Sequence, residues 1–145
     1  MSELMINGND AFKIWGVRMG DGFLNSLFEP AALKDFIESE SRMQNGKRYS
    51  VDDVRLSDRE LTLSFTIQGK STAEFYENRQ RFLEELYKGK IEVSVPRVSD
   101  DVFRLIYTGN SITYQMNTKR TFCQISAKFI EQNPANRGAE NKDGI

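Results

Sequence analysis

The clearest pattern along the chain is an alternation of apolar and polar residues from Arg59 to Gly69. The polar positions between the apolar ones are threonine, serine and glutamine. This period of two predicts a half-buried antiparallel strand, with one face on the core and the other toward solvent. The apolar positions are Leu61, Leu63, Phe65 and Ile67.

A helix is predicted directly after this strand, from Ser71 to Lys88. Ser71 with Glu74 three positions later matches a capping box, and Gly89 follows as a C-terminal capping residue. Apolar residues recur at helical spacing and form one narrow stripe, which we expect to pack on the β core. The stripe consists of Phe75, Phe82, Leu83 and Leu86.

Four shorter alternating segments follow the helix, at 91–95, 103–107, 112–116 and 123–129. They recur about every ten residues, with turn signals between them, which indicates an antiparallel sandwich or barrel. Their apolar residues are Ile91, Val93, Val95, Phe103, Leu105, Tyr107, Ile112, Tyr114, Met116, Cys123, Ile125, Ala127 and Phe129.

The N-terminal part has a short apolar run from Phe12 to Met19 between two turn-rich stretches. We predict a strand here, with Phe12, Ile14 and Val17 on one side and an irregularity at Gly16.

The segment 30–56 has a mixed pattern. Pro30 before two alanines suits a helix start, yet Leu33 and Ile37 also fit an edge strand, and Asn45-Gly46 is a strong hairpin signal. We interpret this segment as a long polar β-arm or loop. A surface helix followed by a loop is the alternative.

Length and tail composition suggest how the chain is organised. A chain of 145 residues fits one domain, which we place at 1–134 with a core that needs no disulfide. Residues 135–145 are polar with almost nothing to bury, so we expect a disordered tail. No run of about 18 apolar residues predicts a membrane span, and the first ten residues lack the pattern of a secretory signal.

The absence of histidine argues against most enzyme chemistry. The chain has no His and one Cys, so Ser-His, Cys-His and most zinc sites are excluded. Cys123 is expected to be a core thiol, and the GVRMGDG segment lacks the Lys and Ser or Thr of a phosphate-binding loop. Several acids lie close in sequence: Asp52-Asp53, Asp58 and Glu60, and Asp100-Asp101. Both aspartate doublets stand at turn-like positions, where aspartate caps backbone groups. We expect no enzyme, catalytic residue, cofactor or metal.

Two short basic clusters with aromatic residues offer a weak nucleic-acid signal. They are Lys47-Arg48-Tyr49 and the segment 117–122. Because the net charge is -1, the chain lacks the overall basic character of a protein that binds the phosphate backbone. We expect both clusters to be solvated loops.

The ordered series of these patterns resembles a known family. The series is R-x-L-x-L-x-F-x-I-x-G from Arg59, the capped helix, G-x-I-x-V-x-V-P from Gly89, F-x-L-x-Y-x-G from Phe103, and A-K-F-x-E-x-N-P from Ala127. It is similar to the N-terminal, tail-tube-like domain of siphophage-type distal tail proteins, from about Phe12 to Pro134.

This resemblance implies a mainly β fold with one flanking helix, an antiparallel β-sandwich or barrel of the phage tail tube type. It also implies a structural role: a ring, six subunits in the usual case, that joins the tail tube to the tail tip or baseplate. The partners would be further copies, neighbouring tube and hub proteins, and DNA as cargo in the lumen, with no membrane. The location would be the virion tail, after synthesis in the bacterial cytoplasm.

Two alternatives stay open. Tail tube subunits share this type of β-sandwich with one helix, and a monomeric β-sandwich that binds a small ligand or sugar is the other class. Known distal tail proteins often carry a second, carbohydrate-binding-like domain, whereas this chain ends soon after Pro134, so the resemblance favours a bare connector ring.

The polar segment from Ser39 to Asp53 is long for a connection. We predict that it is an arm that contacts a neighbouring subunit or lines the channel. Acidic residues in and beside it would suit a lumen through which DNA slides; they are Glu38, Glu40, Asp52 and Asp53.

Overall fold

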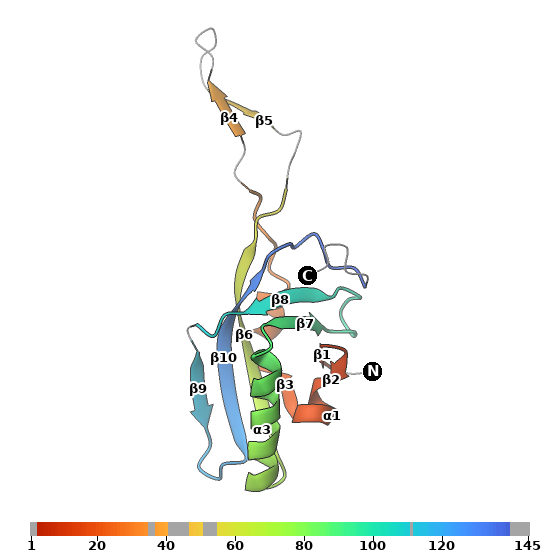
Figure 1. Ribbon diagram of the computed structural model, residues 1–145, viewed down its shortest axis with the longest axis vertical. Coiled ribbons are helices and arrows are strands. Elements are labelled where there is room, and N and C mark those ends of the chain that lie inside the picture. Colours follow the sequence, from red (N-terminus) through yellow and green to blue (C-terminus); the bar gives the residue numbers. More distant parts are fainter. Residues whose placement is uncertain (1–2, 35–36, 41–46, 51–54, 111, 140–145) are drawn as a thin grey trace.

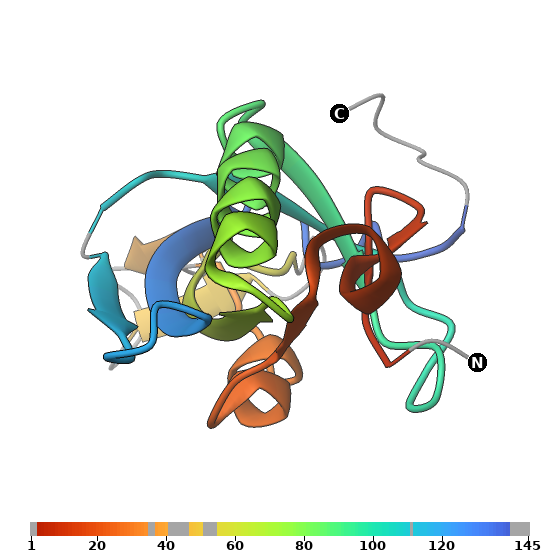
Figure 2. The same cartoon turned by 90° about the horizontal axis from the view of Figure 1, so that it is seen from below.

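The computed structural model describes residues 3–34, 37–40, 47–50, 55–110 and 112–139. Within them, one eight-stranded antiparallel sheet has the order β2-β1-β7-β8-β10-β6-β3, and β9 also pairs with β10. Its strands are β1 (Met5–Ile6), β2 (Asn9–Asp10), β3 (Val17–Met19), β6 (Arg59–Gln68), β7 (Lys90–Ser94), β8 (Phe103–Tyr107), β9 (Thr113–Met116) and β10 (Phe122–Glu131). The sheet curls into a half-barrel around the core (Figures 1 and 2). The predicted mainly β, antiparallel fold is confirmed.

The strands β6 and β10 form the central ladder. They pair over ten positions, from Phe122 opposite Gln68 to Glu131 opposite Arg59. In both strands the alternate residues that the sequence pattern predicted are buried. Because side chains along a strand alternate between faces, this register places all of these apolar residues on one face.

The helix α3 (Thr72–Leu86) packs on that face, as predicted. The Ser71 hydroxyl accepts a hydrogen bond from the Glu74 amide, while the Glu74 carboxylate accepts one from the Lys70 amide. Phe75, Phe82 and Leu86 are buried, and Leu83 is partly buried. The helix ends at Leu86, two residues before the predicted Lys88.

Aromatic rings fill the core between α3 and the sheet. Phe65 lies at its centre: its ring centroid is 5.3 Å from that of Phe23, 5.2 Å from Phe82 and 6.1 Å from Phe129, in edge-to-face arrangements. Such arrangements are the preferred geometry of aromatic pairs. A few large rings therefore supply the core of a chain with modest apolar content.

The predicted strand from Phe12 to Met19 is wrong in its first half. Residues Ala11–Trp15 form the short helix α1, and only Val17–Met19 form β3. The Asp10 carboxylate caps the amides of Phe12 and Lys13, and Gly16 ends the helix at φ +64°. These caps override the strand pattern, so Ala11 and Trp15 are buried while Phe12 and Ile14 are 41% and 37% exposed.

A second short helix, α2 (Phe23–Leu27), was not predicted. It has five residues, too few for an apolar period to stand out, and it buries Phe23 and Leu27, which are four positions apart. It packs beside β6.

The segment after Pro30 forms part of an arm. The strands β4 (Ile37–Glu40) and β5 (Lys47–Ser50) pair antiparallel and project from the body of the molecule (Figure 1). At the root, Leu33 forms a bridge with Leu56. Residues 30–34 are not helical, so the alternative of a helix starting at Pro30 is wrong for them. The Asn45-Gly46 hairpin signal and Asp52-Asp53 lie outside the described residues.

The C-terminal segment was expected to have almost nothing to bury from residue 135 onward, and this is wrong for Asn136 and Arg137. Asn136 is buried, and its carbonyl oxygen accepts a hydrogen bond from Nη1 of Arg104 at 3.1 Å. The carbonyl oxygen of Arg137 accepts from the Val102 amide at 2.8 Å. Polar contacts with the β8 strand, rather than apolar burial, hold this segment, which hydrophobic patterning does not reveal.

Candidate functional site

The singled-out acids that the structure describes, Asp58, Glu60, Asp100 and Asp101, form no metal-binding cluster. Glu60 forms a surface ion pair with Lys128 at 3.3 Å, and Asp58 accepts a hydrogen bond from the Ser57 hydroxyl. Asp100 and Asp101 lie in the connection between β7 and β8. Among the described residues, no group of three or more metal-ligating acidic or thiol side chains occurs.

Cys123 lies on the core face of β10 and is fully buried. Burial raises the pKa of its thiol, although a hydrogen bond with Tyr114 and the charge of Arg79 act in the opposite direction. A protonated, inaccessible thiol is a poor nucleophile. The prediction of a core thiol is confirmed.

The basic segment 117–122 is a structural turn between β9 and β10. The Asn117 side-chain oxygen accepts hydrogen bonds from the amides of Thr121 and Phe122 at 3.0 and 3.2 Å. Arg120 adopts a positive φ of 58° within this turn. The other basic cluster, Lys47-Arg48-Tyr49, belongs to β5 of the arm, so the expectation of a loop is wrong for it.

A buried ionic network lies at the root of the arm. Glu131, at the end of β10, accepts hydrogen bonds from Arg59 and Arg137, and it is fully buried. Arg59 also donates to the carbonyl oxygens of Ser26 and Glu29, just before the arm begins. Hydrogen bonding to Glu131 raises the pKa of Arg137, so this side chain stays a cation. The network therefore fixes where the arm leaves the body.

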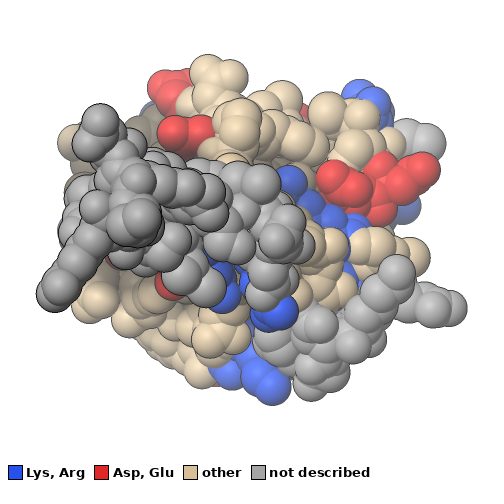
Figure 3. Space-filling model, turned by 90° about the horizontal axis from the view of Figure 1, so that it is seen from above, with Lys and Arg blue, Asp and Glu red and all other residues tan. Residues whose placement is uncertain are grey.

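Figure 3 looks down on the molecule from the arm end. Lys and Arg side chains gather toward the middle of this face, while the visible Asp and Glu side chains lie mainly near its edge. The described part of the arm end is thus not a purely acidic surface. Two of the acids predicted to suit a lumen, Asp52 and Asp53, lie outside the described residues, so that part of the prediction stays a prediction.

One flank of α3 carries an exposed cluster that we call the aromatic patch: Tyr76, Arg79, Tyr114 and Met116. Nε of Arg79 donates to the Tyr114 hydroxyl at 2.9 Å, and the guanidinium lies 5.1 Å from the Tyr114 ring centroid. Both tyrosine hydroxyls lie within 3.8 Å of the Met116 sulfur. Tyr76, Tyr114 and Met116 remain 40%, 39% and 38% exposed, since β9 extends the sheet beyond the helix.

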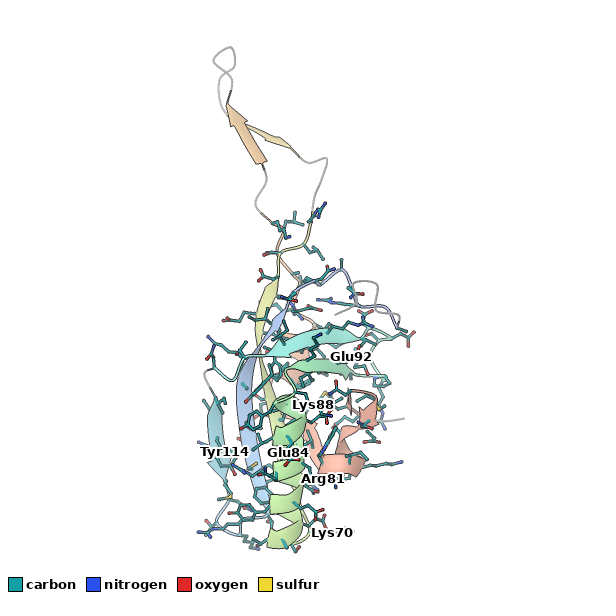
Figure 4. The ribbon with its side chains drawn as sticks, viewed as in Figure 1. Lys70, Arg81, Glu84, Lys88, Glu92 and Tyr114 are labelled. Atoms are coloured by element: carbon teal, nitrogen blue, oxygen red, sulfur yellow. The ribbon has the colours of Figure 1, made fainter. Side chains whose placement is uncertain are left out.

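The other flank of α3 forms a groove with α1, which we call the α1–α3 groove. Its volume is about 470 Å³, within the range of small-ligand sites. Exposed Phe12 and Ile14 line one wall, and side chains of α3 line the other. Its polar lining carries both signs, with Lys13, Lys70, Glu74, Glu77, Asn78 and Arg81. Figure 4 shows Tyr114 and Arg81 on opposite sides of α3.

Sequence patterns alone missed the groove, the patch and the ionic network. The alternation of Ile112, Tyr114 and Met116 correctly indicated a strand, but all residues of β9 are exposed. Arg59 and Glu131 are 72 positions apart and meet only through the register of β6 and β10.

The described residues include no helix with the length and apolar character of a membrane span.

Comparison with known proteins is informative at the level of solved structures. No protein-family model and no curated protein matches the sequence. Among solved structures, the chain is similar to the crystal structure of Dit (gp 19.1) of phage SPP1, a protein described as a paradigm of the hub adsorption apparatus in phages that infect Gram-positive bacteria.

The match has a TM-score of 0.55 at 13% sequence identity, and it covers 91% of this chain and 50% of Dit. The chain thus spans about half the length of that protein. At this identity the likeness concerns the fold, and it confirms at that level the resemblance inferred from the sequence. The mainly antiparallel β fold of this chain, with its curled sheet, is thus similar to the fold of that Dit protein.

Proposed function

We propose that the protein is a structural component of a phage or phage-like tail. The observation that carries this proposal is the fold match to Dit over 91% of the chain. The ordered series from Arg59 to Pro134 supports it independently, because that series resembles the same family through its sequence pattern alone. The proposed location is the virion tail, after synthesis in the bacterial cytoplasm.

We further propose that copies of the chain form a ring, with six subunits, that joins the tail tube to the tail tip or baseplate. Within the eight-stranded sheet of the described residues, β2, β3 and β9 each have one neighbouring strand. Unpaired edges invite pairing or covering by another chain, and a closed ring is one arrangement that protects them. The partners would be further copies together with tube and hub proteins, and DNA would pass through the lumen as cargo.

The role is proposed to be non-enzymatic. The described residues include no group of three or more acidic or thiol side chains that could hold a metal, and the thiol is buried. The buried charges are paired: Arg59 and Arg137 with Glu131 in the network at the arm root, and Arg104 with Glu92. Such paired charges are typical of structural networks as well as of active sites. What distinguishes this network is that its carboxylate is closed off between two arginines.

The first test is the mass of the purified chain by size-exclusion chromatography with light scattering. A six-subunit ring predicts a species with about six times the 16.7 kDa mass of the subunit. If association is weak, the fraction of this species rises with protein concentration. A ring that forms only on the tail would leave a monomer in solution. For this reason the deciding experiment is immunogold electron microscopy of phage particles from a lysate that contains the protein.

Gold particles at one end of the tail support the connector ring, and labelling along the whole tail would instead indicate a tube subunit. Particles without label, in a lysate where the protein is present in soluble form, would overturn the tail role.

The α1–α3 groove favours one other candidate, a monomeric protein that binds a small ligand or sugar. Calorimetric titration with mono- and disaccharides tests that candidate.

A further inference from the structure

The two flanks of α3 differ in shape and charge. Successive residues of a helix are about 100° apart, so Glu74, Glu77, Asn78 and Arg81 share one side of α3 and Tyr76 and Arg79 lie about 180° away. The first set lines the α1–α3 groove and the second belongs to the aromatic patch. Thus each subunit presents a hollow on one flank and an exposed aromatic surface on the other.

The aromatic patch has the composition of an interface centre. Tyrosine, methionine and arginine are enriched in protein interfaces, and here they form a contiguous, exposed group around Met116. The contacts among these side chains hold them in place before any partner arrives. Preorganisation of this kind lowers the entropic cost of binding.

Charge argues against pairing of the patch with itself. Arg79 is a member of the patch, and Lys119 and Arg120 lie in the adjoining turn, where the Lys119 carbonyl oxygen accepts a hydrogen bond from Thr72 of α3. A two-fold contact between patches would bring these cations against their own copies. Like charges that face each other across an interface disfavour association.

The groove supplies carboxylates, which the aromatic patch lacks. Glu74 and Glu77 supply carboxylates on α3, and Phe12 and Ile14 supply exposed apolar surface. Glu77 is 3.9 Å from Arg81 in a highly exposed pair, which leaves its carboxylate available to a second cation. Lys13, Lys70 and Arg81 also line the groove, so the charge complementarity is limited to the two carboxylates of the α3 wall.

We propose that the aromatic patch of one copy of this chain seats in the α1–α3 groove of the next copy. The inference rests on the ring assembly proposed above and identifies its subunit interface. Two different surfaces on opposite flanks make a heterologous contact, which propagates around a ring instead of stopping at a dimer. In this arrangement Arg79 of each copy approaches Glu74 and Glu77 of its neighbour.

Cysteine pairing tests this geometry directly. In a Cys123→Ala background, Tyr76→Cys marks the patch and Ile14→Cys marks the groove. We expect oxidation of a mixture of the two single variants to yield a covalent dimer at least tenfold above a mixture of Tyr76→Cys and Val98→Cys, whose second position lies in neither surface. A chain with both Tyr76→Cys and Ile14→Cys is expected to give a ladder of linked species.

The outcomes separate this interface from the ring itself. Oligomers by light scattering without the mixed cross-link would overturn the interface and leave the ring proposal standing. Preferential self-linking of Tyr76→Cys would overturn it in favour of a two-fold contact. A chain that stays monomeric at every concentration contradicts the interface, while labelling of phage tails still decides the tail role independently.

A charge-reversal series provides a second measurement on the chain with its native cysteine. Arg79→Glu is expected to weaken association at least tenfold, and the double variant Arg79→Glu/Glu77→Arg to recover most of it. The exposed Lys90→Glu on β7 is the matched control and should leave association unchanged. Equal losses for Arg79→Glu and Lys90→Glu, or no recovery in the double variant, would contradict the proposed contact.

Discussion

The Arg59 guanidinium donates from Nε to Oε1 of Glu131 at 3.0 Å, in a position where both side chains are buried. Arg137 approaches the same carboxylate, with its Nη2 at 2.8 Å from Oε1 and its Nε at 2.9 Å from Oε2. One carboxylate therefore joins the start of β6, the end of β10 and the C-terminal segment. Since Arg59 also holds the carbonyl oxygens of Ser26 and Glu29, the arm root depends on the same group.

We predict that Glu131→Ala lowers the free energy of unfolding by about 3–5 kcal/mol, because it leaves the buried Arg59 without a compensating charge. Urea denaturation at neutral pH, followed by circular dichroism, measures the loss. The matched control is Glu60→Ala. Glu60 follows Arg59 in β6, and this change removes an exposed ion pair with Lys128. Its expected cost is below about 1 kcal/mol, and similar losses for both variants would contradict a special role for Glu131.

Gly16 is predicted to resist substitution. Its φ of +64° is unfavourable for other residues, and a Cβ at this position would lie 2.3 Å from the carbonyl oxygen of Gln68. We expect Gly16→Ala to cost more than about 2 kcal/mol, the upper end of the left-handed penalty alone. The control is Gly8→Ala, where φ is +80° but no atom lies within 4 Å of the added Cβ. Thermal unfolding of the two variants compares their losses of stability. A larger loss at Gly8 would mean that the close approach to Gln68 is unimportant.

Phe82 tests the packing of α3 on the sheet. Its ring centroid lies 5.9 Å from that of Trp15 and 5.2 Å from that of Phe65, and its side chain is fully buried. We expect Phe82→Ala to lower the free energy of unfolding by about 3–5 kcal/mol through lost burial and the cavity left behind. Tyr87→Ala, at the exposed end of the same helix, is expected to cost less than about 1 kcal/mol. Chemical denaturation that ranks them in the opposite order would refute this account of the core.

The parts of the fold that sequence patterns predicted are those with long, regular periods. The ten residues of β6 and the capped α3 appear where their patterns placed them. The segment around Phe12 was misread because five residues are too few to define a period. There the Asp10 cap and the left-handed Gly16, both local signals, decided the helix.

The surfaces proposed for assembly could not be predicted in the same way. Tyr76 and Met116 belong to different elements and meet only because β9 pairs with β10 beside α3. The α1–α3 groove likewise exists because Gly16 turns the chain sharply between α1 and β3, close to the Gln68 carbonyl oxygen. These contacts depend on strand register and on α1, which the sequence pattern had predicted as a strand. The pattern of apolar and polar residues along the chain therefore did not indicate them.

The turn between β1 and β2 is tied to the end of α3 through Glu85, and this contact predicts an acid-sensitive component of stability. The Asn7 amide donates to Oε2 of Glu85, and Nζ of Lys88 lies 2.9 Å from Oε1. Burial acts to raise the pKa of Glu85, but these hydrogen bonds and the Lys88 charge outweigh it, so the pKa lies below its ordinary value of 4.5.

A carboxyl with a lowered folded-state pKa stabilises the protein above its unfolded-state pKa and loses that contribution as the pH falls through the folded value. We therefore expect wild type to exceed Glu85→Gln in unfolding free energy at pH 7, with the difference shrinking as the pH falls below about 4.5. Urea denaturation from pH 7 to pH 3 measures this. If the Glu85→Gln difference is flat across this range, the contact with Asn7 does not favour the ionised carboxylate.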